Sequence, residues 1–176
     1  MEITGTTLLK VLGENGEACH GGNGTWFLPN GKPGKWMPKI ENPKPCVRGY
    51  HLVTARQALE GSWLGPRIFV AEARGKRVDD GNKSVHEQAR LLYEVKQWNE
   101  RTARLFACLC AERALPIYEK HERSKAPRRA IEVARLFAGA VSDSERSAAG
   151  SAARSAAWSW QTERLLELFN APGEWT

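Results

Sequence analysis

Cys46, His51 and Glu72 are of the residue types that nucleophilic catalysis needs, namely a nucleophile, a base and a group that orients the base. His51 and Glu72 fall in two separate segments of β-type sequence, so a shared sheet would have to bring them together. A histidine beside Tyr50 also suits a hydrogen-bonded position in the core. His51 and Glu72 are therefore candidate catalytic residues, and one hypothesis is an enzyme or small-ligand binder whose pocket surrounds His51 and includes Arg48.

The same half of the chain holds two thiols and two imidazoles that zinc accepts as ligands, on Cys19, His20, Cys46 and His51. Adjacent residues such as Cys19 and His20 do not easily bind one ion, and Cys46-x4-His51 lacks the tight turn of structural zinc sites. Cys108 and Cys110 are two apart on a predicted helix, about 200° around its axis, and suit small core positions better. We predict neither a metal site nor a bound cofactor.

A basic, proline-rich segment extends from Lys32 to Arg48 and contains Lys35 and Trp36, with Glu41 as its only acidic residue. Lysines can hold phosphates and an aromatic ring can stack on a base, so this segment is a candidate nucleic-acid contact. A solvated loop that proline keeps extended is the alternative. The formal net charge of +6 suits the first interpretation, but basic residues are spread over both halves of the chain, so we favour the solvated loop.

Gly21-Gly22-Asn23-Gly24 is the most glycine-rich stretch, and it is not a nucleotide-binding loop. No Gly-Lys-Ser/Thr follows it, and a predicted strand comes after it where a phosphate loop requires a helix. We therefore do not expect nucleotide hydrolysis.

Charged residues recur at helical spacing in the second half of the chain. Most suit surface ion pairs, each worth a few tenths of a kcal/mol. The alternative is that three arginines bind an acidic protein partner. With the basic loop, this gives a predicted partner-binding set of Lys35, Trp36, Arg128, Arg129 and Arg135.

Turn sequences divide the first half into short segments of β-branched and aromatic residues. They predict strands at 7–12, 24–28, 49–53 and 67–73, the last buried on both faces because apolar residues occupy both sets of alternate positions. Thr54 is placed to begin a short helix over residues 54–59. Residues 85–97 fit two patterns: helix propensity and a Ser84-x-x-Glu87 capping box favour a helix, while alternation over 89–95 fits a strand.

Helical periodicity dominates the second half. Asn99 can begin a helix that Pro116 should end or kink, and Pro127 and Gly139 are placed to start and stop the next one. Ser142-x-x-Glu145 then predicts a long helix with an alanine stripe. The fold class is thus α+β: a small β-rich unit, 1–97, packed on a C-terminal bundle of three to four helices, 98–176.

Composition narrows the class of protein. Hydrophobic residues make up 41% of the 176 and charged residues 26%, which is typical of a globular chain and not of a disordered one. No stretch approaches the length of a membrane span, so we expect no membrane association. The first five residues lack a cationic start and an apolar run, which predicts a cytoplasmic protein.

Several short sequence motifs in the first 98 residues resemble those of an uncharacterised group of phage and actinobacterial proteins. The most distinctive are Cys46-x-x-Gly49-Tyr50-His51 and Trp63-Leu64-Gly65-Pro66. This resemblance implies no activity, but it does imply an extended segment after Asp79-Asp80-Gly81.

From Trp98 onward the chain is similar to a helical module called immunity-protein-like. The sequence segments that carry this resemblance include 110–116, 127–135 and 160–166. That resemblance implies a binding role. Because no specific catalytic motif is present, the preferred hypothesis is a non-enzymatic binder of a protein partner, of an immunity or phage counter-defence type. The pocket around His51 and the nucleic-acid contact remain the alternatives.

Overall fold

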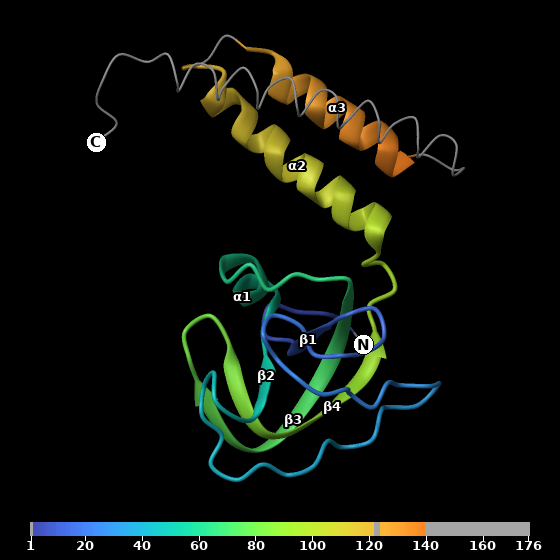
Figure 1. Cartoon of the computed structure of the whole chain (residues 1–176), viewed down its shortest axis with the longest axis vertical. Coiled ribbons are helices and arrows are strands. Elements are labelled where there is room, and N and C mark those ends of the chain that lie inside the picture. Colours follow the sequence, from blue (N-terminus) through green and yellow to red (C-terminus); the bar gives the residue numbers. More distant parts are fainter. Residues whose placement is uncertain (1, 122–123, 140–176) are drawn as a thin grey trace. The chain divides into compact units, whose positions relative to one another are not determined.

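The computed structural model describes residues 2–121 and 124–139. The chain divides into two compact units, Met1–Asn99 and Glu100–Thr176. In the described residues the fold class is α+β, with a four-stranded antiparallel sheet and three helices (Figure 1). None of these helices combines the length and the apolar character that crossing a lipid bilayer requires.

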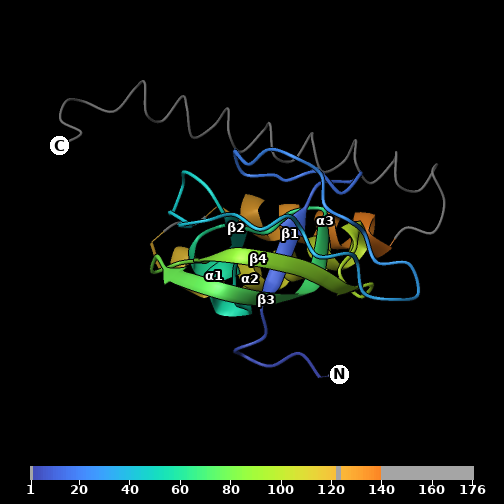
Figure 2. The ribbon, with the colours of Figure 1, turned by 90° about the horizontal axis from the view of Figure 1, so that it is seen from below.

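The sheet of the first unit contains β1 (Leu9–Leu12), β2 (Tyr50–Leu52), β3 (Arg67–Asp79) and β4 (Ser84–Glu94) in the order β1-β3-β4-β2. The two long strands β3 and β4 lie side by side as a hairpin (Figure 2). The sheet curls until its outer strands meet, where Leu9 of β1 pairs with Val53, the residue after β2. Both backbone hydrogen bonds of this bridge form, at 2.7 and 3.0 Å.

Each face of the sheet carries its own apolar cluster. One contains Phe69 and Leu91, both fully buried, with Leu12, Trp26, Tyr50 and Leu52. The other contains Ile68 and Val70 of β3 with Leu9, Val11, Val53 and Ala58. The predicted burial of 67–73 on both faces is therefore confirmed. The strand continues to Asp79, beyond its predicted end, because β4 pairs with it as far as that residue, with a shift of register between Arg74 and Arg77.

The helix prediction for residues 85–97 is wrong, and the alternative strand is correct. Residues 84–94 form β4, whose neighbours are β3 on one side and β2 on the other. Val85, Ala89 and Leu91 of this strand are completely buried, and that burial outweighs the local helix propensity. The strand predicted at 24–28 is also wrong, since only Thr25 in it forms a bridge, with Glu17.

The basic, proline-rich segment is attached to the sheet. Backbone amides of Gly34, Met37 and Ile40 donate to carbonyls of β4 at 2.8 to 2.9 Å. This segment is therefore not a freely solvated loop. After β2, α1 (Ala55–Glu60) begins with the predicted cap, Thr54, whose side chain accepts from Gln57 in a capping box.

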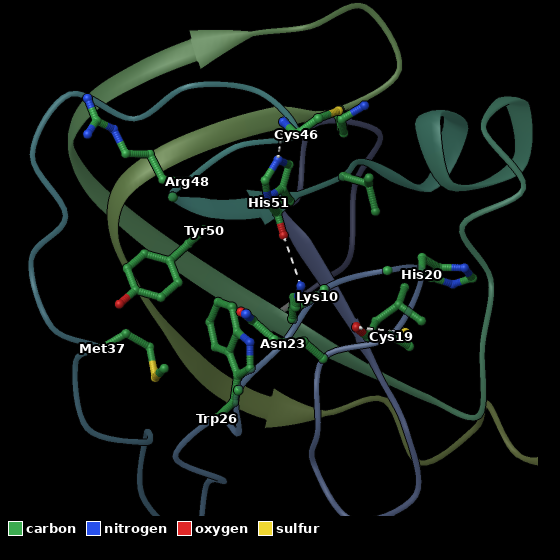
Figure 3. Close-up of a pocket in the computed structure, with 18 of the residues that line it drawn as sticks. Lys10, Cys19, His20, Asn23, Trp26, Met37, Cys46, Arg48, Tyr50 and His51 are labelled. Carbon is green, nitrogen blue, oxygen red and sulfur yellow. Dashed lines mark hydrogen bonds between the residues drawn. The ribbon is translucent and has the colours of Figure 1, made fainter.

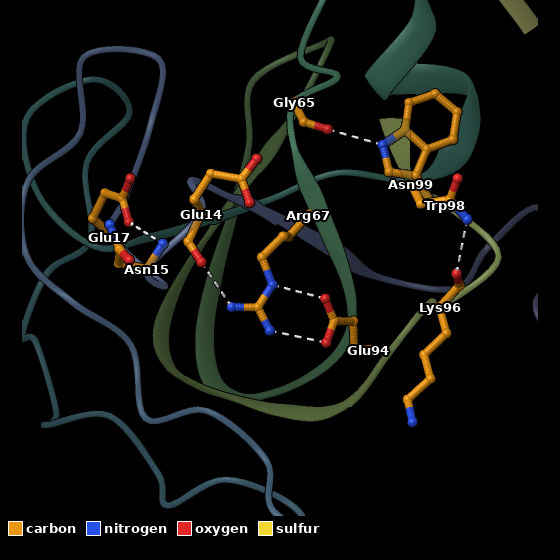
Figure 4. A network of polar contacts seen from close by, with 9 residues as sticks. All are labelled: Glu14, Asn15, Glu17, Gly65, Arg67, Glu94, Lys96, Trp98 and Asn99. Carbon is orange, nitrogen blue, oxygen red and sulfur yellow. Dashed lines mark hydrogen bonds and ion pairs between the residues drawn. The ribbon is translucent and has the colours of Figure 1, made fainter. Parts of the chain in front are cut away.

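Polar contacts also fasten the far ends of the long strands (Figure 4). Arg67 at the start of β3 forms two hydrogen bonds with Glu94 at the end of β4, at 2.7 and 2.9 Å. A third nitrogen of the same guanidinium donates to the Glu14 carbonyl at 3.0 Å. The indole of Trp98 donates to the Gly65 carbonyl at 2.8 Å.

The described part of the second unit consists of α2 (Glu100–Tyr118) and α3 (Ala126–Gly139). Pro116 lies inside the last turn of α2, and the helix ends two residues later. Cys108 is buried as predicted, but the predicted core position of Cys110 is wrong, because this residue is exposed. The helix predicted from Ser142 lies outside the described residues.

Candidate functional site

A pocket of about 690 Å³ opens where β1 and β2 separate (Figure 3). In the described chain, the Leu9–Val53 bridge is the only backbone pairing between these two edges of the sheet. Beyond it the loops 18–24 and 46–49 form much of the pocket wall. The lining residues include Lys10, Cys19, Trp26, Met37, Tyr50 and His51.

Lys10 is the residue of the pocket that its local sequence least explains. It alternates along β1 with Leu8 and Leu12, both of which pack in the apolar cluster with Trp26. Its Nζ lies 3.4 Å from the carbonyl oxygen of His51 and 5.0 Å from the centre of the Trp26 indole. None of the described residues that line the pocket is acidic.

The ammonium of Lys10 is therefore in an apolar setting without a carboxylate from the pocket wall. Burial lowers the pKa of Lys10 from 10.5 to about 8, and the nearby thiol of Cys19 opposes this shift. At neutral pH most molecules still carry the charge, and above pH 8 most do not. The sequence signal for this residue is a lysine at an inward position of an alternating strand, and the site prediction from sequence missed it.

Cys19 lies on the opposite side of the gap from β2. Its Sγ donates to the Val11 carbonyl at 3.5 Å, a weak hydrogen bond. Burial raises the pKa of the thiol, which therefore stays protonated at neutral pH. The Lys10 side chain thus donates to a backbone carbonyl of β2, and the Cys19 side chain donates to one of β1. Both hydrogen bonds form where the two strands no longer pair with each other.

Trp26 and Tyr50 form an aromatic wall of the pocket. Their rings are 5.3 Å apart in an edge-to-face arrangement, and the Tyr50 hydroxyl donates to the Pro38 carbonyl at 2.7 Å. Burial raises the pKa of Tyr50, so this hydroxyl is neutral. The proline-rich segment contributes Met37 and Ile40 to the same wall.

His51, a candidate catalytic residue, lines the pocket but is tied to the backbone. Its Nε2 accepts a hydrogen bond from the Cys46 amide at 3.1 Å. Burial lowers the pKa of His51, and the positive charges of Lys10 and Lys83 lower it further. The neutral ring therefore holds the loop around Cys46, whose φ of 57° is left-handed.

Glu72, the other catalytic candidate, does not join His51. Its carboxylate pairs with Arg90 on the neighbouring strand at 2.7 Å. Arg48 does line the pocket, but its guanidinium donates to the Asn42 carbonyl at 2.9 Å and points away from Lys10 (Figure 3). The structure therefore does not assemble Cys46, His51 and Glu72 into a catalytic set.

The rim of the pocket is built around Trp63. The ring of His20 contacts the Trp63 indole edge-on at 5.5 Å, and the ammonium of Lys83 lies 5.2 Å from its centre. Lys83 also forms an ion pair with Asp80 at 2.9 Å, which raises the pKa of Lys83. This rim cation is thus neutralised by a carboxylate, unlike Lys10.

The predicted partner-binding residues lie elsewhere in the two units. Lys35 is exposed, whereas the ring of Trp36 carries the guanidinium carbons of Arg74 and Arg90 at 4.1 and 4.6 Å from its centre. These cations already occupy the aromatic surface that a nucleic-acid base would need.

The three predicted arginines of the second unit lie on α3. Arg128 pairs with Glu119 at 2.8 Å, and Arg135 pairs with Glu112 at 2.6 Å. These ion pairs join α3 to α2 and its C-terminal end. Arg129 forms no ion pair with a side chain of residues 2–121 or 124–139, and an acidic partner for this set of arginines stays a prediction.

In residues 2–121 and 124–139, no group of three or more His, Cys, Asp or Glu side chains is arranged to hold a metal ion. Comparison with family models, with curated proteins and with solved structures found no match to this chain. The resemblances to phage, actinobacterial and immunity-like proteins therefore remain predictions.

Proposed function

We propose that the first unit is a binding module for a small organic anion with an apolar or aromatic body. The observation that carries this proposal is Lys10, a cation among apolar side chains in a pocket whose described lining includes no carboxylate. A charge in such a place reduces the stability of the folded protein unless something pairs with it. An anionic ligand would provide that missing partner.

The shape and chemistry of the pocket agree with such a ligand. A volume of about 690 Å³ is within the range of sites for small molecules. Trp26, Tyr50 and Met37 offer apolar surface beside the ammonium, and they suit a flat or aliphatic body. The ligand would then place its carboxylate, or another anionic group, against Nζ of Lys10.

A pair of probes that differ in charge tests the proposal: 2-naphthoate and its neutral amide, 2-naphthamide. We expect the whole protein at pH 7 to bind the carboxylate about tenfold more tightly, because a charge-assisted hydrogen bond contributes roughly 1.5 to 3 kcal/mol. This preference should decline as the pH rises above about 8, where Lys10 loses its proton. Isothermal titration calorimetry measures both affinities.

Lys10→Met should abolish the preference for the carboxylate while binding of the amide persists. The matched control is Lys35→Met, which removes the same charge from an exposed position outside the pocket. Equal affinity of wild-type protein for the two probes, or no saturable binding of either one, would contradict the proposal. Circular dichroism establishes that each variant is folded.

Binding of a protein partner, and an immunity or counter-defence role, stay separate predictions. They depend on the resemblance of the second unit and on the absence of catalytic motifs from the sequence. Co-purification of a specific protein with the full chain, lost on Arg129→Glu, is the result that these predictions require.

A further inference from the structure

The amine of Lys10 has an unusual combination of features for a lysine that only balances charge. It lies at a pocket wall, its hydrogen bond to the His51 carbonyl is long at 3.4 Å, and the pocket supplies no carboxylate to hold its proton. We propose that Lys10 is a covalent anchor: its amine condenses with the aldehyde or ketone group of a small oxo-acid that enters this pocket. The inference rests on the proposed function, because both use the same pocket.

The contacts of Lys10 place its nitrogen and leave its lone pair available once the proton is lost. The His51 carbonyl accepts one N–H, and the Trp26 ring lies 5.0 Å from Nζ. In the first of these contacts the nitrogen is the donor, so the lone pair of the neutral amine is not used by it. An exposed lysine is protonated at neutral pH, whereas the pKa of Lys10, about 8, leaves roughly a tenth of it neutral at pH 7.

The other titratable groups that face Lys10 do not hold a proton on it. Burial raises the pKa of the Cys19 thiol and of the Tyr50 hydroxyl, so neither is an anion at pH 7. His51 is neutral because its own pKa is lowered. Lys83 at the rim is paired with Asp80. A reactive lysine of this kind resembles others that desolvation activates in an apolar pocket.

The reaction is balanced without an oxidant or reductant. The neutral nitrogen of Lys10 attacks the carbonyl carbon, a C–N bond forms, and the π electrons move to oxygen, which receives the proton lost by nitrogen. The hydroxyl of this carbinolamine then departs with a proton as water while nitrogen forms the C=N bond. One aldehyde and one amine thus give one imine and one water, and hydrolysis reverses the process.

Reductive trapping on the whole wild-type protein tests this inference. The probe is 4-carboxybenzaldehyde at limiting concentration, with sodium cyanoborohydride to reduce the imine to a stable secondary amine. Peptide mass mapping then gives the rate of labelling at each lysine and separates Lys10 from the α-amino group. At pH 7 we expect Lys10 to be labelled at least about tenfold faster than exposed Lys32 and Lys35, because a larger fraction of it is neutral.

An excess of 2-naphthoate should slow the labelling of Lys10 and leave Lys32 and Lys35 unaffected. Labelling of Lys10 at the rate of the exposed lysines, or more slowly, overturns the covalent inference. If 2-naphthoate is still preferred over 2-naphthamide in that case, the proposed anion binding stands by itself. Fast labelling of Lys10 that 2-naphthoate does not slow would place the reaction outside the bound-ligand site and would also overturn the inference.

Discussion

The β3–β4 hairpin and the gap between β1 and β2 belong to one sheet, yet they differ in whether their cationic side chains have carboxylate partners. On the hairpin, Arg67 pairs with Glu94 and Arg90 with Glu72, each across neighbouring strands. In the gap, Lys10 faces apolar and aromatic side chains without a carboxylate among the described lining residues. Cationic side chains thus have carboxylate partners on the hairpin, whereas Lys10 has none among the described residues that line the pocket.

This difference separates a stabilising role from a functional one. Cross-strand ion pairs add modestly to the stability of a sheet. A partly buried ammonium without an anion reduces stability, and such groups concentrate at binding and catalytic sites. The hairpin therefore accounts for how the unit folds, and the gap is where we expect it to bind.

The largest effect should come from the packing of the hairpin. Phe69→Ala removes a fully buried ring from the cluster that includes Leu91 and Trp26, and we expect it to lower the free energy of unfolding by about 3 to 5 kcal/mol. Urea denaturation measures this. A loss under 1 kcal/mol would mean that the hairpin is not the stabilising region.

In the gap between β1 and β2 we expect a substitution to increase the free energy of unfolding. Lys10→Met should raise the free energy of unfolding at pH 7, by at most about 3 kcal/mol, because the folded state no longer holds a desolvated ammonium. The folded pKa of about 8 lies below the ordinary value of 10.5, so between these values the unfolded wild-type chain binds more protons. Wild-type stability should therefore contain a contribution that rises with pH from about 8 to 10.5.

Lys10→Met should lack that rise, which urea titrations at several pH values can measure. Lys35→Met, at an exposed position, should retain it and change stability by less than about 0.5 kcal/mol at pH 7. A wild-type curve parallel to that of Lys10→Met from pH 7 to 10.5 would contradict the assignment of Lys10 as a partly buried cation without a carboxylate partner.

A smaller loss is expected from an ion pair of the hairpin. Glu94→Gln should lower the free energy of unfolding by about 1 kcal/mol at pH 7, because two charge-assisted hydrogen bonds with Arg67 are weakened. Arg67 lowers the folded pKa of Glu94, so the contribution is present above the ordinary value of 4.5. It is lost as the pH falls through the lowered pKa, and the two stability curves should converge there.

The smallest effect is expected at Glu72, the catalytic candidate that the structure places outside the pocket. Glu72→Gln should change stability by less than about 0.5 kcal/mol, because its pair with Arg90 is partly exposed. Its affinity for 2-naphthoate should stay within a factor of two of the wild type. A tenfold loss of affinity would mean that the two regions do not have separate roles.

The sequence predicted those elements whose signals are local. Thr54 begins α1 through a capping box that four residues define, and the apolar residues of 67–73 indicate a strand buried on both faces. The helix prediction for residues 85–97 was wrong because the structure of this segment depends on contacts that are distant in the sequence. Their capping box is a local helix signal, while the burial of Val85 depends on pairing with β2 and β3 and that of Ala89 on pairing with β3, which only the folded chain supplies.

The candidate site was predicted in part. Tyr50 and His51 do line the pocket, but the separation of β1 from β2 depends on loops whose courses no periodicity reveals. Lys10 was recognisable only from its alternation with Leu8 and Leu12, and that requires knowing which face of β1 is buried. The prediction of Glu72 as a catalytic residue was wrong because its carboxylate pairs with Arg90, which lies in a segment that was not predicted firmly as a strand.

The attachment of the proline-rich segment to β4 has a consequence for self-association. Exposed carbonyls along a strand invite a second chain to add itself, which is a route to aggregates. Here the carbonyls of Glu87, Ala89 and Leu91 already accept amides of this segment. Pro33 and Pro38 have no N–H to continue the ladder outward. The segment thus covers three backbone carbonyls of β4 with which a second chain would otherwise have to pair.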